Sequence, residues 1–518
     1  MSIAQGLLTL MLCLPAGLRA EAPPAWVQSQ GVDPAAYPGA RYLTGYGLSA
    51  PGGTEADQRR QALAMAKDAL ASSIRTQVSS EFTARVTQQD QHMSHYAQNL
   101  VRTRASLELE GLDTVLTWQD GRKNLTYALA VLDKPRTLQL LEVQLGRQGR
   151  DCAASFAAGR AAGDPSGLIR AQHLREAMEQ QMVIYAVLAG APPPAVPGPA
   201  SAEIAGELRR YYAGRKDLDG SVATAALDLG ADLPRDLRLL MDRITYADTP
   251  FCGSLSAYLE QTLAAQLTAF GQVKILDKAL ARDAIRDTGM SGDLGQALQS
   301  QAAVRGTLQD LGDQVKLTLT VTSAAGEQLA TASTSLAAPL VRKAGLKLVP
   351  DNYLEARQTL EICNAQVQAS TLQVKLALDR GDGGIYRKGD KLHLFVKANL
   401  DCYVKLLYHQ VDGTKVLIFP NKYHPDARIK KGQLYQIPPD DNSFDLEVEA
   451  PFGAEMVKLI ASTDPIDLEG KEPDSNGLTV VRDNLAGLLG RTRSIVLKKA
   501  DVQYCEATAV VNTMERAN

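Results

Sequence analysis

The residues best suited to metal chemistry are a pair of histidines. His92 and His95 are three residues apart, so on a helix they would share one face, and Asp90 is close enough in sequence to add a carboxylate. The surrounding run is polar and rich in glutamine, which is typical of a solvated surface. We therefore expect no metal site at this pair.

A second group of ligand-type side chains is an acidic loop in the last sixth of the chain. Oxygen-rich loops bind calcium in extracytoplasmic proteins, but the regular ligand spacing of such loops is missing here. We expect an ordinary solvated loop, and no metal or cofactor in the protein. The acids concerned are Asp464, Asp467, Glu469, Glu472 and Asp474.

The local signatures of common enzymes are absent from the sequence. It contains no Gly-x-Ser-x-Gly nucleophile elbow, no Gly-x4-Gly-Lys-Ser/Thr phosphate loop, no His-Glu-x-x-His and no Gly-x-Gly-x-x-Gly after a strand. We therefore expect a protein that is not an enzyme, with no catalytic residues. A hydrolase whose acids converge only in the folded chain is the remaining catalytic alternative.

Aromatic residues of the last third of the chain could form a recognition surface, because their rings supply contact area at low entropic cost. We expect Tyr403 and Phe419 to lie in a core. Tyr423 and Tyr435 lie beside expected loops, so they are our candidates for a surface that binds a partner.

Length and charge limit the classes of protein. A chain of 518 residues should form about three domains, because a single core stops growing at roughly 250 to 300 residues. The formal net charge is -3, so the chain as a whole has no basic field to hold phosphates. We expect no nucleic-acid partner.

The N-terminus has the pattern of a secretory signal peptide. An apolar run over residues 6–15 is followed by small residues up to Ala20 and then by a Pro-rich stretch. We expect residues 1–20 to be removed and the mature protein to reside in the periplasm or at the periplasmic face of the outer membrane. No later stretch reaches the roughly 18 to 20 apolar residues of a membrane-spanning helix.

Five cysteines remain after such a cleavage, and an oxidising compartment allows disulfides. Cys363 and Cys505 lie before and near the end of the C-terminal β region, so a bridge between them would close that domain. Buried thiols are the alternative.

The periodicity of the first part predicts a small α+β domain over residues 21–139. The strand expected from residue 74 has alternating apolar or small residues, and Asp120-Gly121 is a hairpin signal. The expected elements are a helix over 54–73, a strand over 74–86, a helix through residues 92–100, and strands over 107–118 and 124–132.

The middle of the chain predicts two further units separated by a spacer. Residues 140–190 read as a helical hairpin broken at Gly163-Asp-Pro-Ser-Gly167, and 191–202 as a Pro-rich linker. Residues 203–345 alternate helices and strands, with leucines at helical spacing over 255–267 and a clear period of two over 315–321. We expect an α/β sandwich domain there.

Residues 366–510 predict an all-β sandwich, because short alternating runs are separated by Gly-rich turns. The fold class is therefore α+β multidomain: a small α+β domain with a helical hairpin, an α/β sandwich domain and a C-terminal β-sandwich. The expected strands are 373–378, 391–397, 402–408, 414–419, 444–449 and 456–462.

The first domain resembles small outer-membrane lipoproteins that share a fold with the N-terminal domain of flagellar assembly protein T. Gly45 and Gly47 suit a strand with close backbone approach, and the small alanine face lets the helix pack tightly on the sheet. The residues that carry the resemblance are Pro24–Val27, Tyr42–Gly47, Ala62–Ala71, and Trp118 with Tyr127–Asp133.

The α/β domain resembles that of curli secretion lipoprotein G, which is shared with penicillin-binding-protein activators and the N-terminal domain of TolB. The matching runs are Ile244–Thr249, Val273–Asp277, Val304–Thr307 and Val315–Gln328.

The last domain looks like a domain of unknown function found at the C-termini of bacterial multidomain proteins, which implies a β domain without known catalysis. Its carrying residues are Tyr386–Asp390, Asp401–Lys405, Leu417–Asn421, Gly432, Ile437-Pro438 and Ala450–Gly453.

These resemblances imply a non-catalytic envelope protein that binds partner proteins in assembly or as a scaffold, in its sharpest version in a flagellar ring or secretion machine. A periplasmic module that activates a peptidoglycan enzyme is the alternative. Envelope proteins are the expected partners, with outer-membrane or peptidoglycan association and homo-oligomer formation left open.

Overall fold

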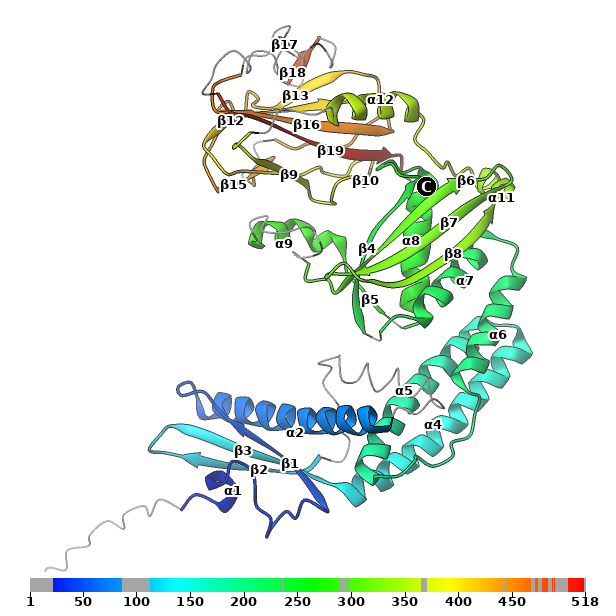
Figure 1. Cartoon of the computed structure of the whole chain (residues 1–518), viewed down its shortest axis with the longest axis vertical. Coiled ribbons are helices and arrows are strands. Elements are labelled where there is room, and N and C mark those ends of the chain that lie inside the picture. Colours follow the sequence, from blue (N-terminus) through cyan, green and yellow to red (C-terminus); the bar gives the residue numbers. More distant parts are fainter. Residues whose placement is uncertain are drawn as a thin grey trace, which may run out of the picture. The chain divides into compact units, whose positions relative to one another are not determined.

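A computed structural model describes most of the chain and divides it into two compact units (Figure 1). The first comprises Met1–Ala153 and Leu174–Gly198, and the second Ala154–His173 and Pro199–Asn518. The expected signal segment and the pair His92 and His95 lie outside the described residues. The described residues are 22–85, 112–234, 236–271, 273–288, 295, 298–364, 370–440, 444–466, 471–473, 478–482, 487, 489 and 502–516.

The fold is α+β and multidomain, with a sheet-rich C-terminal region, as the sequence predicted. Within the described parts of the chain, no helix is long and apolar enough to cross a membrane. The predicted domain limits are finer than the division into two units and stay predictions.

The first unit contains an antiparallel sheet in the order β1-β3-β2. The central strand β3 is buried on both faces: Ala128, Ala130 and Leu132 point to one core and Tyr127, Leu129 and Val131 to the other. Trp26 of α1 packs in the second core. The elements are α1 (Ala25–Gln28), β1 (Tyr42–Leu48), α2 (Glu55–Arg85), β2 (Leu112–Asp120) and β3 (Leu125–Asp133).

The strand predicted over residues 74–86 is wrong, because α2 continues without a break to Arg85. Ala62, Ala66, Leu70 and Ile74 are spaced by four residues and all are fully buried on the sheet. These four residues form one apolar helical face, so the sequence favours a helix as far as Ile74. The alternation from residue 74 is interrupted by Thr76, Ser80 and Ala84, so it indicates an apolar strand face only weakly.

The helical hairpin consists of α4 (Lys134–Ala162) and α5 (Pro165–Ala189), and it breaks where the sequence predicted. In the first unit, Leu141, Val183 and Val187 join the core under α2. In the Pro-rich stretch that follows α5, Pro197 lies against Gly149 of α4.

Close contact between α2 and β1 depends on two glycines of the strand. A Cβ atom at Gly47 would lie 2.1 Å from the carbonyl oxygen of Ala62, and one at Gly45 would lie 2.2 Å from that of Ala66. Both obstructing atoms belong to the helix backbone and cannot move alone. The predicted close backbone approach is confirmed.

We expect Gly47→Ala to destabilise the first unit by about 3 kcal/mol, because overpacking against backbone forces the helix away from the sheet. Unfolding can be followed by tryptophan fluorescence, because Trp26 and Trp118 are the chain's two tryptophans and both lie in this unit. Gly39→Ala is the matched control, since a Cβ there meets nothing within 4 Å. Equal unfolding midpoints for the two variants would refute the packing argument.

The second unit contains an α/β domain built on a sheet in the order β5-β4-β6-β7-β8. Its strand β4 pairs in parallel with β5 and β6, and β6, β7 and β8 are antiparallel. The predicted leucines of α8 are fully buried, and α7 and α8 cover one face of the sheet (Figure 1). The elements are α6 (Ser201–Gly214), α7 (Leu218–Ala231), β4 (Leu237–Tyr246), α8 (Ser254–Ala269), β5 (Val273–Ile275), the 3-10 turn η1 (Lys278–Leu280), α9 (Ala281–Thr288), β6 (Ala302–Asp310), β7 (Gln314–Ser323), β8 (Gln328–Ala337) and α11 (Ala338–Lys343).

The C-terminal domain is a sandwich of two sheets. The larger runs β10-β19-β16-β12-β13-β18-β17, with β14 beside β12, and the smaller runs β15-β11-β9. Apolar residues from both sheets form the core between them. The elements are α12 (Tyr353–Asn364), β9 (Val374–Leu378), β10 (Gly384–Arg387), β11 (Leu394–Ala398), β12 (Cys402–His409), β13 (Lys415–Phe419), β14 (Arg428–Ile429), β15 (Leu434–Ile437), β16 (Ala454–Ser462), β17 (Lys471–Pro473), β18 (Thr479–Val481) and β19 (Tyr504–Met514).

The strand predicted over 444–449 is absent as a regular element. The segment forms one isolated bridge, between Glu447 and Lys391. Phe444, Leu446 and Val448 still point into the core, so the period of two was correct for burial. A continuous ladder does not form because the facing partner, around Gly389, is a turn with positive φ.

A loop of the α/β domain anchors the sandwich. Phe251 is fully buried among Ala356 of α12, Met456 of β16 and Val510 of β19. Beside it, the buried side chain of Asn512 accepts a hydrogen bond from the Cys252 backbone N–H (3.1 Å) and donates to the carbonyls of Pro250 and Gly383. These contacts join the two domains of the second unit.

We expect Phe251→Ala to cost about 3 to 5 kcal/mol, because it empties a fully buried aromatic site between the two domains. Hydrogen exchange measured by mass spectrometry should show faster exchange in both β16 and the loop of residues 247–253. Leu354→Ala is the control, since Leu354 of α12 is 67% exposed. Protection of β16 that stays at the wild-type level would contradict the anchoring role.

Candidate binding pocket in the C-terminal domain

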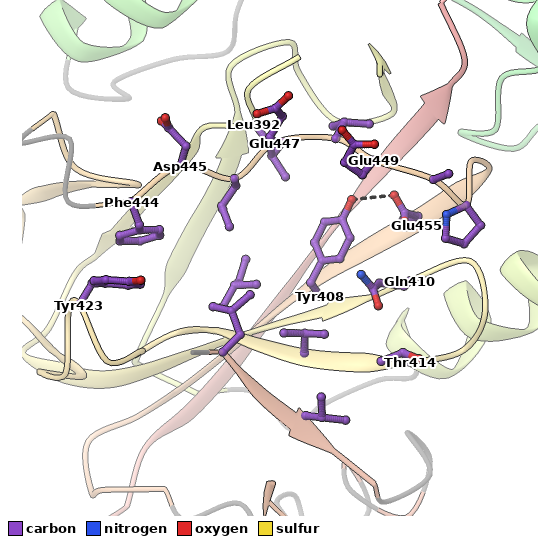
Figure 2. A pocket seen from close by; sticks show the side chains of 18 residues that line it. Leu392, Tyr408, Gln410, Thr414, Tyr423, Phe444, Asp445, Glu447, Glu449 and Glu455 are labelled. Carbon is purple, nitrogen blue, oxygen red and sulfur yellow. Dashed lines mark hydrogen bonds between the residues drawn. The ribbon is translucent and has the colours of Figure 1, made fainter. Parts of the chain in front are cut away.

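A pocket of about 710 Å³ opens into the interior of the sandwich. Its walls come from β12 and β13 on one side and from the segment over 444–451 on the other (Figure 2). This volume and mixed lining are within the range of small-ligand and side-chain sites. The lining residues are Leu392, Tyr408, Gln410, Thr414, Val416, Ile418, Tyr423, Phe444–Pro451, Glu455, Leu478 and Val480.

A buried carboxyl group marks one end of the pocket. Glu455 of β16 is only 5% exposed, and its Oε2 accepts a hydrogen bond of 2.8 Å from the hydroxyl of Tyr408 on β12 (Figure 2). Burial raises the pKa of Glu455 to about 7, and the hydrogen bond from Tyr408 opposes that rise only in part. Burial and the neighbouring Glu455 raise the pKa of Tyr408 well above its usual value. Glu455 therefore changes charge near neutral pH while Tyr408 stays a hydrogen-bond donor.

The other end of the pocket is aromatic. Tyr423, which is 48% exposed, stacks on Phe444 with ring centroids 5.8 Å apart and planes at 15° (Figure 2). The Lys422 ammonium lies 4.7 Å from the centroid of Tyr423. The Asn421 side chain accepts hydrogen bonds from the backbone of Tyr423 and of His424, which fixes the loop. The ring of Tyr423 is thus a firmly held wall at the mouth.

The rim of the pocket is acidic. Asp445, Glu447 and Glu449 are exposed, in contrast to Glu455. Lys391 pairs with Asp445 at 2.7 Å and Lys388 with Glu449 at 3.5 Å. Neither lysine lines the pocket, and the described residues that line it include no lysine, arginine or histidine. The pocket therefore presents acceptors and negative charge to an occupant.

The structure does not bring the two predicted partner-surface tyrosines together in one site. Tyr423 lines the pocket, whereas Tyr435 packs against the sandwich core, and its hydroxyl accepts a hydrogen bond from the backbone N–H of Lys430. Phe419 is buried as expected, and Tyr403 is only partly buried.

The predicted bridge between Cys363 and Cys505 is not made. Cys363 packs with Leu407, Ile460 and Tyr504 on the α12 side of the large sheet, whereas Cys505 packs against the core between the sheets. The two thiols lie on opposite faces of that sheet because Cys505 follows Tyr504 directly in β19, and successive side chains of a strand alternate.

The described residues include no group of three or more metal-ligating side chains. Of the acidic loop, Asp464 and Glu472 belong to the described residues, whereas Asp467, Glu469 and Asp474 lie outside them.

Sequence reasoning missed Glu455, although a signal was present. Glu455 and Lys458 are charged residues within β16, a strand in which all nine residues are buried. A buried acid needs a partner or an altered pKa, so an acid inside an apolar strand marks a candidate site.

The family model described as Domain of unknown function (DUF4384) matches residues 385–465, which include most of the pocket lining. The predicted resemblance of the last domain to a domain of unknown function is therefore confirmed for these residues. No curated protein matches the chain.

The solved structures with limited likeness to the chain include two LpoB C-terminal domains and one secreted protein. The LpoB C-terminal domains from Salmonella enterica (10% identity) and Escherichia coli (16%) each match 23% of this chain and 97% of their own, with TM-scores of 0.20. The secreted protein HP1454 from Helicobacter pylori has 10% identity over 58% of this chain and 90% of its own, with a TM-score of 0.18. Likeness at this level carries no conclusion about function.

The raised pKa of Glu455 predicts a pH-dependent stability difference between the wild type and Glu455→Gln. This carboxyl group is more easily ionised in the unfolded chain than in the folded one. Its contribution to stability is therefore full below the unfolded pKa and is lost as the pH rises through the folded pKa of about 7. Between pH 4.5 and 8 the wild type should lose about 3 kcal/mol relative to Glu455→Gln. Urea unfolding followed by circular dichroism measures this difference, and a constant difference would rule out the shifted pKa.

Proposed function

We propose that this chain is a non-catalytic protein of the cell envelope that binds partner proteins through the pocket of its C-terminal domain. The observation that carries the proposal is the composition of that pocket: a mixed apolar and aromatic cavity with an acidic rim and one buried carboxyl group. Cavities with apolar walls and a few placed polar groups are typical of recognition sites.

The arrangement of the acids favours binding over hydrolysis. Acid–base hydrolysis by carboxyl groups uses two that converge on the substrate, with environments that separate their pKa values. Among the acids that line the pocket, Glu455 is buried, whereas Asp445, Glu447 and Glu449 are exposed and two of these are paired with lysines.

The C-terminal domain is attached to the α/β domain by several contacts, which suits a scaffold protein. Phe251 and Asn512 join it to the α/β domain, and Ile285 of α9 packs on Phe395 of the small sheet. Arg282 and Arg286 of α9 also pair with Asp440 beyond β15. A partner bound in the pocket of the C-terminal domain would thus have a fixed orientation relative to the α/β domain. The signal-like N-terminus supports an exported location for this assembly.

The proposal is tested by crosslinking envelopes that contain the tagged mature protein and identifying what co-purifies. We expect at least one envelope protein to be recovered with the wild type and to fall roughly tenfold with Tyr423→Ala, because truncating an aromatic anchor costs a hot-spot interaction. Leu354→Ala is the control, since it removes an exposed apolar side chain of the same domain away from the pocket.

The identity of the recovered protein decides the finer role. Ring or secretion components would support the assembly version, and a peptidoglycan synthase would support the activator version. If the tagged wild type recovers no envelope protein, partner binding through the pocket is overturned. It is also overturned if Tyr423→Ala recovers as much of the partner as the wild type does.

A further inference from the structure

We propose that the pocket accepts a lysine side chain of a partner protein, with the ammonium group bound at Glu455 and the methylene stem along the apolar wall. This inference rests on the proposed function and specifies the chemistry of its partner.

Charge selects a cation. Among the described residues that line the pocket, four carry carboxyl groups and none is basic. Asp445 and Glu449 are partly neutralised by lysines outside it. For Glu447 and Glu455, no ion pair with another described residue is present. An incoming ammonium would compensate the charge that makes ionised Glu455 costly to bury.

The hydrogen-bond geometry selects a lysine over an arginine. Glu455 already accepts a hydrogen bond from the Tyr408 hydroxyl, and it also has hydrogen bonds with the Thr513 side chain and the Val411 backbone. A guanidinium group gains most when it donates to both oxygens of a carboxylate, whereas an ammonium acts as a point charge with rotatable donors. The side chains of Gln410 and Thr414, which also line this part of the pocket (Figure 2), offer further acceptors for the ammonium hydrogens.

The walls suit the rest of a lysine side chain and the peptide that carries it. Leu392, Val416 and Ile418 line the pocket, and lysine buries its four methylene groups against such surfaces. At the mouth, the stacked rings of Tyr423 and Phe444 would pack against neighbouring residues of the partner. A volume of about 710 Å³ exceeds one side chain, so a segment of the partner would enter with it.

Binding and protonation of Glu455 must be coupled. The charged and titratable groups that face Glu455 are Tyr408 from β12, Asp412 from the turn before β13 and Glu449 from the segment over 444–451. Tyr386 of β10 in turn raises the pKa of Tyr408. Because Glu455 ionises near pH 7, an ammonium ligand should bind more tightly above that pH and should release a proton from the protein when it binds below it.

The test is isothermal titration calorimetry on the full mature chain at pH 6 and 8.5. The probe is a peptide of five residues, blocked at both ends, with one central lysine flanked by leucines. We expect affinity for the wild type to rise roughly tenfold between the two pH values, in line with the ionised fraction of Glu455. The same peptide with acetyl-lysine or arginine should bind at least roughly tenfold more weakly.

Two variants isolate the site. Glu455→Gln should lose the affinity and its pH dependence, whereas Glu361→Gln, which alters an exposed acid of α12, should keep both. If Glu455→Gln does not fold, Tyr408→Phe is the second variant: it retains the carboxyl group but removes a hydrogen bond that lowers its pKa. The rise in affinity should then shift to higher pH.

Equal binding of the lysine and acetyl-lysine peptides, or unchanged binding by Glu455→Gln, would overturn the lysine site. Binding of free pentylamine as tightly as the peptide would overturn the assignment to a protein segment. If the peptides fail while Tyr423→Ala still loses its envelope partner, the proposed function stands and only the ligand chemistry is wrong.

Discussion

The second unit depends on one strand that is buried on both faces. All nine residues of β16 are buried, and its neighbours β12 and β19 pair with it along almost its whole length. On one face it completes the core between the two sheets, and on the other it supports α12 and receives Phe251. Such a strand would normally be apolar throughout, yet β16 includes Glu455 and Lys458.

The free-energy cost of burying a charge is offset in different ways at these two residues. Lys458 pairs with Glu506 at 2.6 Å, with both side chains only 3% exposed, and it also donates to the backbone carbonyl of Cys363. That pair is internally balanced and fixes the position of α12 over the sheet. Glu455 has no cationic partner among the described residues, so its burial raises its pKa instead. The charge of Lys458 is therefore balanced within the protein, whereas the charge of ionised Glu455 is met by hydrogen bonds alone among the described residues.

The sequence predicted the elements whose pattern is local. Three local patterns indicate which face is buried: the leucines of α8, the glycines of β1 and the alternation of β7. The structure confirms all three. The error in α2 has a local cause too: apolar residues alternate with polar ones from Ile74 onward and so predict a strand, whereas Ile74 itself continues the buried face of the helix with Leu70.

The candidate site was less predictable because it is assembled by register between distant segments. Tyr408 and Glu455 meet only because β12 and β16 are antiparallel neighbours with Tyr408 opposite Val457. The rings of Tyr423 and Phe444 likewise come together across a loop and an irregular segment. The same alternation of side chains explains why the two cysteines do not meet. Adjacent residues of β19 point to opposite faces of the sheet.

Strand parity also links the pocket to the domain junction. Glu455 and Met456 are consecutive, so one points into the pocket and the other contacts Phe251 on the opposite face. A change of charge at Glu455 thus occurs on the same piece of backbone that anchors the α/β domain. In β16 a displacement of one residue moves its neighbour on the opposite face, because the strand is held by ladders on both sides. Occupancy of the pocket and the fit of the junction therefore share one rigid element.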